Sequence, residues 1–260
     1  MLGPLRDFVR DEPALRAPVL WGMSRFRSLA DAERGLYTLC YHSVPAAAQG
    51  SFAEQIRFLR RHGDVIDADA AAERCAAGWP SRDRAFLLTF DDGYADTVDV
   101  AMPVLRAEGA PAIVFLVSAW IDAPPAGAGL PAYMTRADVL AWCETGFQVG
   151  SHTHTHRRLS TLDEASVRAE LADSRAALSA LVGRPVDHFA CPWGVAGADF
   201  DADRTPALAA ECGYRTFFTT RRDRARSADD LLLMPRHVAE PQWKTYAFDA
   251  LLRRRSHARR

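Results

Sequence analysis

Two adjacent carboxylates end an apolar stretch of the chain, in a position where they could perform acid–base or metal chemistry. Residues 85–90 read Ala-Phe-Leu-Leu-Thr-Phe, and Asp91, Asp92 and Gly93 follow directly. Such a run predicts a buried strand, and carboxylates at the C-terminal end of a buried strand usually face a cleft. Neighbouring strand residues point to opposite faces, so both carboxylates can serve one site only if the chain bends, as Gly93 permits. An Asp-Asp-Gly surface turn is the competing interpretation.

Three alternating histidines follow a second short apolar stretch. Residues 147–156 read Phe-Gln-Val-Gly-Ser-His-Thr-His-Thr-His. Two imidazoles four residues apart on a helical turn lie on one face and can bind one metal ion, which favours His152 and His156 as ligands. If the segment is extended instead, His154 shares that face as well. The spacing therefore indicates a metal site with two or three histidine ligands.

Three motifs, each at the end of an expected strand, occur in an order that resembles the NodB-like polysaccharide deacetylases of carbohydrate esterase family 4. They are Thr89 to Gly93, Ser151 to His156 and Phe189 to Gly194, within a match from about residue 36 to residue 238. The resemblance implies that Asp91 is the general base. It also implies that Asp92, His152 and His156 hold a divalent metal ion. Zinc is favoured by this imidazole and carboxylate set, while nickel, cobalt, iron and manganese are allowed.

The third motif supplies further candidates and contains two departures from the commonest family pattern. By resemblance, the backbone N–H of Trp193 binds an oxyanion and its indole faces a sugar, with Tyr94 and Pro192 as further oxyanion or substrate residues. Many family members have an arginine, which orients the base, where this chain has Ala190. Arg236 is the candidate substitute. Cys191 could ligate zinc as a thiolate, but a small buried residue beside the cleft is the favoured interpretation.

Two histidines compete for the role of catalytic acid. His42 ends an expected strand at residues 36–42, and His237 lies near the end of an expected strand at residues 231–238. The Tyr-His pair at Tyr41 resembles the N-terminal motif of the deacetylases that act on poly-N-acetylglucosamine. The sequence around His237 does not match the commoner C-terminal motif, so the resemblance favours His42.

The elements that position these residues alternate between strand and helix. At least seven alternations predict a βα barrel or a doubly wound α/β sheet, and the resemblance selects a distorted (β/α)7 barrel of the NodB type. Capping boxes predict that two of the helices begin at Ser51 and Thr161. The expected division is an N-terminal extension packed on the barrel (residues 1–35), the deacetylase domain (36–240) and a basic C-terminal tail (241–260).

Composition excludes some partners and predicts a location. The chain is 48% hydrophobic and 25% charged, as in ordinary globular proteins, and a formal net charge of −1 argues against a nucleic-acid partner. Met1 to Ala30 contains no uninterrupted apolar core, and the longest apolar stretch, residues 112–121, is too short to span a bilayer. Five widely spaced cysteines indicate reduced thiols. We therefore expect a cytoplasmic protein whose C-terminal tail could contact a membrane peripherally.

The expected function is metal-dependent hydrolytic N-deacetylation of an N-acetylated amino sugar in an oligosaccharide, a polysaccharide or a lipid-linked glycan, with release of acetate. One alternative is an amidase of the same superfamily that acts on a cyclic imide or ureide in a small closed pocket. A non-catalytic carbohydrate-binding protein is the other alternative, but binding alone does not require a base at Asp91. Nothing in the sequence identifies a pair of carboxylates for glycoside hydrolysis.

Overall fold

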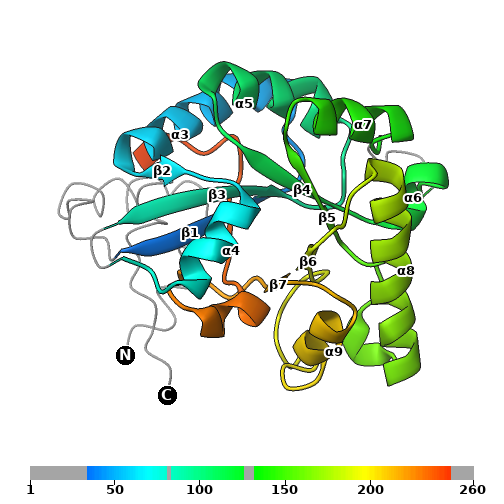
Figure 1. The fold of residues 1–260 in the computed structure, drawn as a ribbon. Helices are drawn as coiled ribbons and strands as arrows, with labels where there is room; N and C mark the ends of the chain where they lie inside the picture. The colour runs from blue at the N-terminus through cyan, green and yellow to red at the C-terminus, as the bar shows by residue number, and fades with distance from the viewer. Residues whose placement is uncertain (1–33, 81–82, 126–131, 247–260) are drawn as a thin grey trace, which may run out of the picture.

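The computed structural model describes residues 34–80, 83–125 and 132–246, and within them one parallel sheet organises the chain (Figure 1). The sheet order is β7-β6-β5-β4-β3-β1-β8, and β2 pairs with the first half of β3. The strands are β1 (Gly35–Tyr41), β2 (Asp64–Val65), β3 (Arg84–Phe90), β4 (Ala112–Leu116), β5 (Gln148–Ser151), β6 (His188–Ala190), β7 (Thr216–Phe218) and β8 (His237–Val238).

The segment before β8 brings the two edges of the curled sheet together. Met234 pairs with Phe218 at the end of β7, and three residues later β8 pairs with β1, with His237 beside Leu39. One short stretch of chain thus contacts both edges. The result is a distorted parallel βα barrel, as the sequence predicts.

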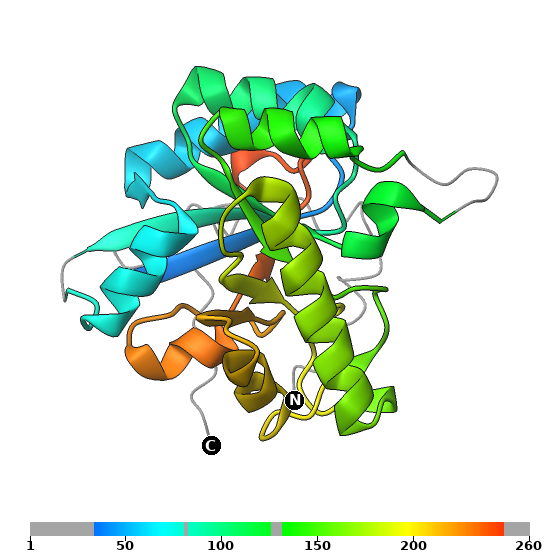
Figure 2. The ribbon, with the colours of Figure 1, turned by 45° about the vertical axis from the view of Figure 1, so that its right-hand side comes forward.

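Most helices cover the outside of the curled sheet, whereas α4 (Ala68–Ala76) packs against the apolar side chains inside it (Figures 1 and 2). The other helices are α3 (Gln49–His62), α5 (Met102–Glu108), α6 (Ser118–Asp122), α7 (Arg136–Glu144), α8 (Glu164–Val182) and α9 (Thr205–Glu211). A π-helical turn, η3 (Thr97–Ala101), precedes α5, and the 3-10 helical turns are η2 (Ala46–Ala48), η4 (Leu159–Thr161) and η5 (Ala228–Leu233). Pro103 lies in the first turn of α5, where its missing N–H is not needed.

The strands are buried on both faces, and the two faces belong to two separate apolar clusters. The outer cluster joins residues such as Leu88 of β3 to the surrounding helices. The inner cluster fills the barrel and includes Leu87, Phe115 and, from α4, Ala71 and Cys75. Because α4 contributes to the inner cluster, apolar side chains fill much of the barrel. The polar interior residues Thr89, Asp91 and Arg236 lie toward the C-terminal ends of the strands.

The last strand is shorter than expected. The sequence predicts a strand over residues 231–238, but residues 228–233 form the turn η5 and only His237 and Val238 form a strand. Pro235, which lacks a backbone donor, separates the two. The pairing of His237 with Leu39 places both side chains on the outer face. Arg236, one residue earlier, therefore points into the barrel.

Both predicted capping boxes are wrong about where their helices begin. Helix α3 begins at Gln49, so Ser51 lies inside it, and its hydroxyl donates to the backbone oxygen of Pro241 at 2.7 Å. Helix α8 begins after Asp163, whose carboxylate accepts the N–H of Ser166 at 2.8 Å. A second good capping residue two positions further along the chain replaces Thr161 in that role.

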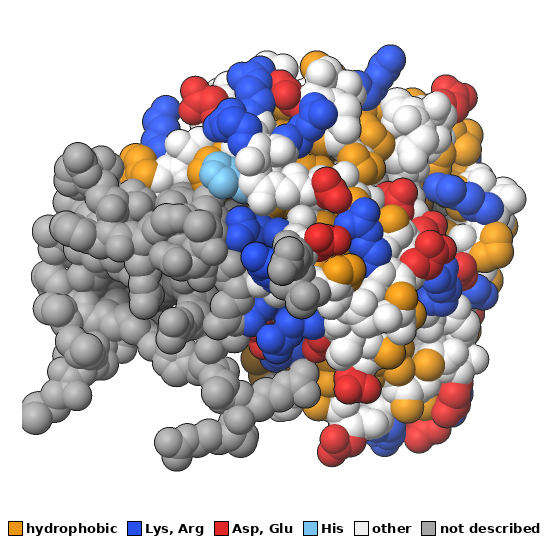
Figure 3. Space-filling model, turned by 60° about the vertical axis from the view of Figure 1, so that its left-hand side comes forward, with side chains coloured by type: hydrophobic (Ala, Val, Ile, Leu, Met, Phe, Trp, Pro, Cys, Tyr) orange, Lys and Arg blue, Asp and Glu red, His pale blue; other side chains and the backbone are white. Residues whose placement is uncertain are grey.

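The expected terminal segments fall largely outside the described residues. The extension at residues 1–35 is described only from Arg34, and the tail at residues 241–260 only as far as Tyr246, so the domain division stays a prediction. In the part of the chain that the structure describes, no helix combines the length and the apolar character needed to cross a bilayer. Basic and acidic side chains are interspersed over the coloured part of the face in Figure 3, in keeping with the net charge near zero.

The buried His237 predicts a pH-dependent stability. Its ring stacks on Tyr37 with centroids 5.9 Å apart, and burial lowers its pKa from the ordinary 6.5 to about 4. Protonation then favours the unfolded chain, so stability is fully present above pH 6.5 and is lost as the pH falls toward 4. His237→Phe should remove about 2–3 kcal/mol of this loss. Urea unfolding of both proteins at pH 7 and pH 4.5 measures the effect. Equal losses in the two proteins would contradict it.

Candidate metal and catalytic centre

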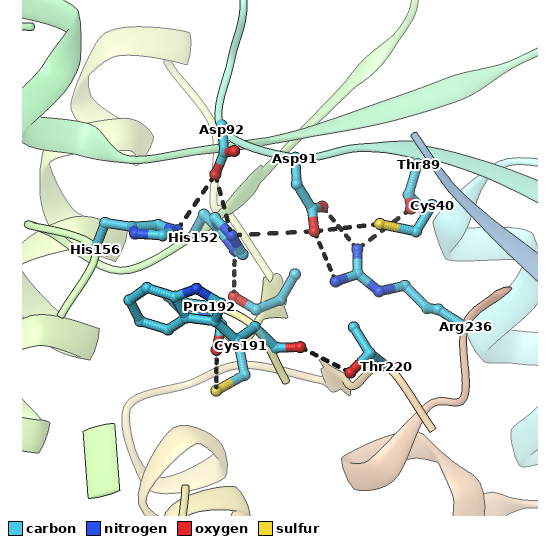
Figure 4. Close-up of polar contacts among 12 residues, drawn as sticks. Cys40, Thr89, Asp91, Asp92, His152, His156, Cys191, Pro192, Thr220 and Arg236 are labelled. Carbon is cyan, nitrogen blue, oxygen red and sulfur yellow. Dashed lines mark hydrogen bonds and ion pairs between the residues drawn. The ribbon is translucent and has the colours of Figure 1, made fainter. Parts of the chain in front are cut away.

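The polar residues expected from the sequence meet where the C-terminal ends of the strands converge (Figure 4). Asp91 and Asp92 follow β3, and His152 follows β5. Arg236 directly precedes β8 and approaches Asp91 from the side opposite to His152 (Figure 4). Parallel strands bring such residues to one edge of the sheet, so distant parts of the sequence form one site.

Left-handed backbone conformations bend three loops around this site. Among the described non-glycine residues, those with positive φ are Asp92 at 70°, Thr153 at 69°, His156 at 60° and Trp193 at 56°. Such conformations are uncommon for residues with a side chain and tend to occur at functional sites. At Asp92 the bend continues into Gly93, where a Cβ would lie 2.6 Å from the Leu116 side chain. This bend turns two neighbouring carboxylates into one site, as the sequence requires.

Asp92, His152 and His156 form a compact group of metal-ligand types. Their ligand atoms lie within 4.8 Å of one another. Oδ1 of Asp92 lies 3.5 Å from Nε2 of His152 and 3.3 Å from Nε2 of His156. The geometry therefore brings together the three residues that the sequence assigned to a metal.

The hydrogen bonds of the group fit a bound cation. Nδ1 of His152 lies 2.7 Å from the backbone oxygen of Ala190, which can only accept, so the proton is on Nδ1 and Nε2 carries a lone pair. That lone pair faces Oδ1 of Asp92, which is buried and has no hydrogen-bond partner among the described residues. Two acceptors directed at each other repel unless a cation lies between them. Burial also lowers the pKa of His152 to about 4, which keeps the ring in its neutral, metal-binding form.

The histidine loop is held by Glu170 of α8, which the sequence analysis missed. Its carboxylate accepts the backbone N–H groups of His154 and Thr155 at 2.9 and 2.8 Å. Within the loop, the Thr153 hydroxyl accepts the N–H of His156 at 2.9 Å. The segment is neither the helical turn nor the extended strand that the spacing allowed. The available signal was a glutamate within the apolar stripe of α8, one residue before Leu171.

His154 does not join the metal group. Its Nδ1 lies 2.8 Å from the hydroxyl of Ser118, and the ring is absent from the ligand groups found among the described residues. The structure therefore supports the two-histidine arrangement over the three-histidine one.

Asp91 forms a buried two-point ion pair with Arg236 (Figure 4). The two guanidinium Nη atoms each donate to one carboxylate oxygen of Asp91, both at 2.7 Å. Arg236 is also fixed by the Thr219 carbonyl, which accepts from Nε at 3.1 Å. Ala190, where many relatives have the arginine, is fully buried. The arginine absent from the third motif is therefore supplied from residue 236.

Electrostatics keep Asp91 ionised. Burial, the largest single influence, would raise the pKa of its carboxyl, but the charge of Arg236, together with further contributions from His152, the Arg236 hydrogen bonds and His42, outweighs burial, so the pKa lies well below the ordinary value. The thiol of Cys40 lies 3.4 Å from the second carboxylate oxygen, and burial raises the pKa of that thiol, which keeps it neutral. An ionised, oriented carboxylate thus lies 4.0 Å from Nε2 of His152.

The two competing histidines lie on different faces of the barrel wall. A ring nitrogen of His42, at the end of β1, lies within 4.8 Å of a carboxylate oxygen of Asp91, and its side chain is exposed. His237 is buried on the outer face against Tyr37. Only His42 of this pair lies beside the carboxylate.

Aromatic side chains surround His156 at the mouth of the barrel. Its ring centre lies 4.8 Å from that of Trp193 and 5.1 Å from that of Trp120. Tyr94 stacks on Tyr133 at 5.2 Å, and burial followed by the nearby Asp92 charge raises the pKa of Tyr94. Trp193 is 48% exposed, which excludes the interpretation that its indole is a core residue.

Cys191 and Pro192, the two residues that precede Trp193 in the third motif, are buried. Pro192 is buried, and its backbone oxygen lies 3.6 Å from the Cys191 thiol. Burial raises the pKa of Cys191, so the thiol stays protonated. This agrees with the interpretation of Cys191 as a small buried residue rather than a zinc ligand.

Comparisons with known proteins agree with this geometry. The barrel is similar to IcaB from Ammonifex degensii, with a TM-score of 0.71 and 22% identity over 85% of this chain and 98% of that one. A Streptococcus pyogenes deacetylase, PplD, solved with acetate, has the same TM-score at 21% identity, over 85% of this chain and 98% of that one. These similarities confirm the distorted (β/α)7 barrel.

Sequence relatives point to the same family. YxkH of Bacillus subtilis (strain 168), whose name assigns it provisionally to the polysaccharide deacetylases, is 23% identical over 82% of this chain and 75% of its own. The poly-β-1,6-N-acetyl-D-glucosamine N-deacetylase of Escherichia coli (strain K12) is 35% identical over 35% of this chain and 15% of its own. The family model described as polysaccharide deacetylase matches residues 79–217. The chain therefore belongs to the polysaccharide deacetylase family and is a hydrolase of amide bonds.

Proposed function

We propose that this protein catalyses metal-dependent N-deacetylation of an N-acetylated amino sugar in an oligosaccharide, a polysaccharide or a lipid-linked glycan. The observation that carries the proposal is the ionised Asp91, held by Arg236 at two points and lying 4.0 Å from a ring nitrogen of the metal-ligand group. In the proposed reaction water adds OH to the acetyl carbon, the C–N bond breaks, and the nitrogen takes up a proton. Acetate and a free amino sugar result.

Asp92, His152 and His156 would hold the divalent ion, with zinc favoured by a donor set of two imidazoles and one carboxylate. When bound, such an ion supplies Lewis acidity and lowers the pKa of water from nearly 16 to about 7. Asp91 is separate from these ligands because Arg236 occupies both of its oxygens. Asp91 is therefore not a metal ligand in this proposal, and its carboxylate acts as the proton acceptor.

Asp91 is a weak base, because Arg236 lowers its pKa. A general base works best when its pKa is near the working pH, so the role of this carboxylate depends on its fixed orientation. Arg236 is bonded to both carboxylate oxygens, and the Thr219 carbonyl holds its Nε. We infer that Arg236 makes Asp91 a weaker base but fixes the direction from which its carboxylate can accept a proton.

Trp193 and His42 complete the proposed mechanism. Among the described residues, the backbone N–H of Trp193 donates to no protein group, while its carbonyl accepts from Thr220 at 2.7 Å, which fixes the peptide. A fixed, unused donor of this kind suits an oxyanion. His42 lies beside Asp91 and is exposed, so it can deliver the proton to the departing nitrogen.

An open aromatic rim favours a sugar over a small cyclic amide. Trp193, within the third motif, and Val195, just after it, are 48% and 52% exposed. Flat apolar side chains at an open mouth suit a sugar ring, whereas a cyclic imide would require a small closed pocket. Relatives named as poly-N-acetylglucosamine N-deacetylase and chitin deacetylase support the same substrate class. Binding alone does not require an ionised carboxylate beside the metal ligands, which counts against a non-catalytic binding protein. Cytoplasmic localisation and peripheral membrane contact stay predictions.

Acetate release tests the proposed function directly. The purified protein, loaded with zinc, should release acetate from at least one member of a panel of N-acetylated oligosaccharides and lipid-linked N-acetyl sugars. Dialysis against a strong chelator should abolish turnover, and zinc should restore it. Asp92→Asn should lower both metal content and turnover, whereas Asp91→Asn should lower turnover and leave metal content near one equivalent.

Full turnover of a metal-free protein would contradict the role of the metal. Hydrolysis of a cyclic imide or ureide, with no acetate released from any sugar, would favour the alternative amidase.

The role of His42 predicts an asymmetric pair of variants. A general acid typically contributes about 10²–10⁴ in rate, so His42→Ala should reduce kcat by that factor and retain its metal. His237→Ala should reduce kcat far less, because its ring packs on the outer face against Tyr37. Turnover and elemental analysis of both variants provide the measurement. A larger loss of kcat in His237→Ala, with metal intact, would reverse the assignment.

A further inference from the structure

An arginine beside the metal group has no part in the mechanism above. Arg158 follows the ligand His156 by two residues, and its guanidinium carbon lies 5.0 Å from the ring centre of Trp193. The same indole lies 4.8 Å from the His156 ring. The indole of Trp193 therefore contacts both the guanidinium and a metal ligand.

A buried carboxylate holds this arginine in place. Nε of Arg158 lies 3.2 Å from Oδ1 of Asp199, and the two side chains are 48% and 5% exposed. The other oxygen of Asp199 accepts the N–H of Val195 at 2.8 Å, so the carboxylate belongs to the rim loop. Because the carboxylate is hidden and the guanidinium is not, the side of the pair that faces solvent is positive.

The held arginine keeps free donors. Among the described residues, the contacts of the Arg158 side chain are the Asp199 contact through Nε and the stacking on Trp193. The two Nη groups of a guanidinium form a planar fork that matches a carboxylate or phosphate at two points. Fixing the side chain in advance reduces the entropy lost when such a group binds.

We propose that Arg158 and Trp193 form a subsite for an anionic group, a carboxylate or a phosphate, on the part of the glycan adjacent to the N-acetylated sugar. The inference rests on the proposed function and narrows its substrate class. The sugar packs against the exposed part of the Trp193 indole, and its anionic substituent binds the Nη fork of Arg158. A carboxylate would come from a uronic acid, and a phosphate from a sugar phosphate or a lipid-linked glycan.

Three probes separate the neutral and anionic classes. They are N,N′-diacetylchitobiose, a disaccharide of N-acetylglucosamine and glucuronic acid, and N-acetylglucosamine 1-phosphate. The wild-type kcat/KM should be about tenfold higher for at least one anionic probe than for the neutral one, as expected for a charge-assisted hydrogen-bonded pair. The preferred probe identifies the source of the anion. Because the contact is exposed, the preference should shrink at high salt.

Variants assign the preference to this arginine. Arg158→Gln should bring the ratio of anionic to neutral kcat/KM close to one, mainly through KM, and Arg158→Lys should retain part of it. Arg157→Gln is the matched control, since it removes the same charge from the neighbouring exposed position and should keep the wild-type ratio. No preference in the wild type, equal effects of Arg157→Gln and Arg158→Gln, or an equal loss on all probes in Arg158→Gln would overturn the proposal.

A binding measurement separates this inference from the proposed function. If no probe releases acetate, calorimetric titration with N-acetylglucosamine 1-phosphate in the presence of a chelator still measures the subsite without the metal. The wild type and Arg157→Gln should bind about tenfold more tightly than Arg158→Gln. Equal affinities in the three proteins would overturn the proposal.

Discussion

The buried ion pair between Asp91 and Arg236 is the interaction on which the rest of the site depends. Two charges taken out of water are tolerated only when geometry and hydrogen bonding are good, and here both Nη atoms, Nε and both carboxylate oxygens are used. Arg236 arrives on the same short segment that pairs with Phe218 on one side and with β1 on the other. The segment that closes the barrel is therefore the same segment that orients the base. The carboxylate that remains beside it, Asp92, keeps an oxygen free for the metal group.

The arrangement of strands and helices was largely readable from the sequence because the strands are buried on both faces. Continuous apolar runs such as residues 85–90 and 112–116 are strands in the structure. The errors occur where short polar contacts decide the outcome. Asp163 and Thr161 both fit a helix cap, and only the final packing selects one. The apolar residues 231–233 fit a strand, yet they form the turn η5, and after Pro235 only His237 and Val238 form a strand.

The metal and base residues were predictable because each follows a strand within a short motif. Residues that support the site from other elements were harder to find. Arg236 has no local signal, since it enters the site only through the register between β8 and β1. Glu170 of α8 holds the histidine loop, and the only sign of this role in the sequence is a charged residue within the apolar stripe of the helix. The separation of His42 from His237 also depends on register, because a shift of one residue would exchange the faces of His237 and Arg236.

The most direct test of the ion pair is a double-mutant cycle on the free energy of unfolding, with metal removed from all four proteins. Arg236→Gln alone leaves a buried carboxylate unpaired and should cost about 3–5 kcal/mol. Asp91→Asn alone leaves a buried guanidinium unpaired and should also be strongly destabilised. The double variant should be more stable than either single variant, with a coupling of about 3 kcal/mol or more between the two positions. If the two losses simply add, the pair does not organise the centre as described.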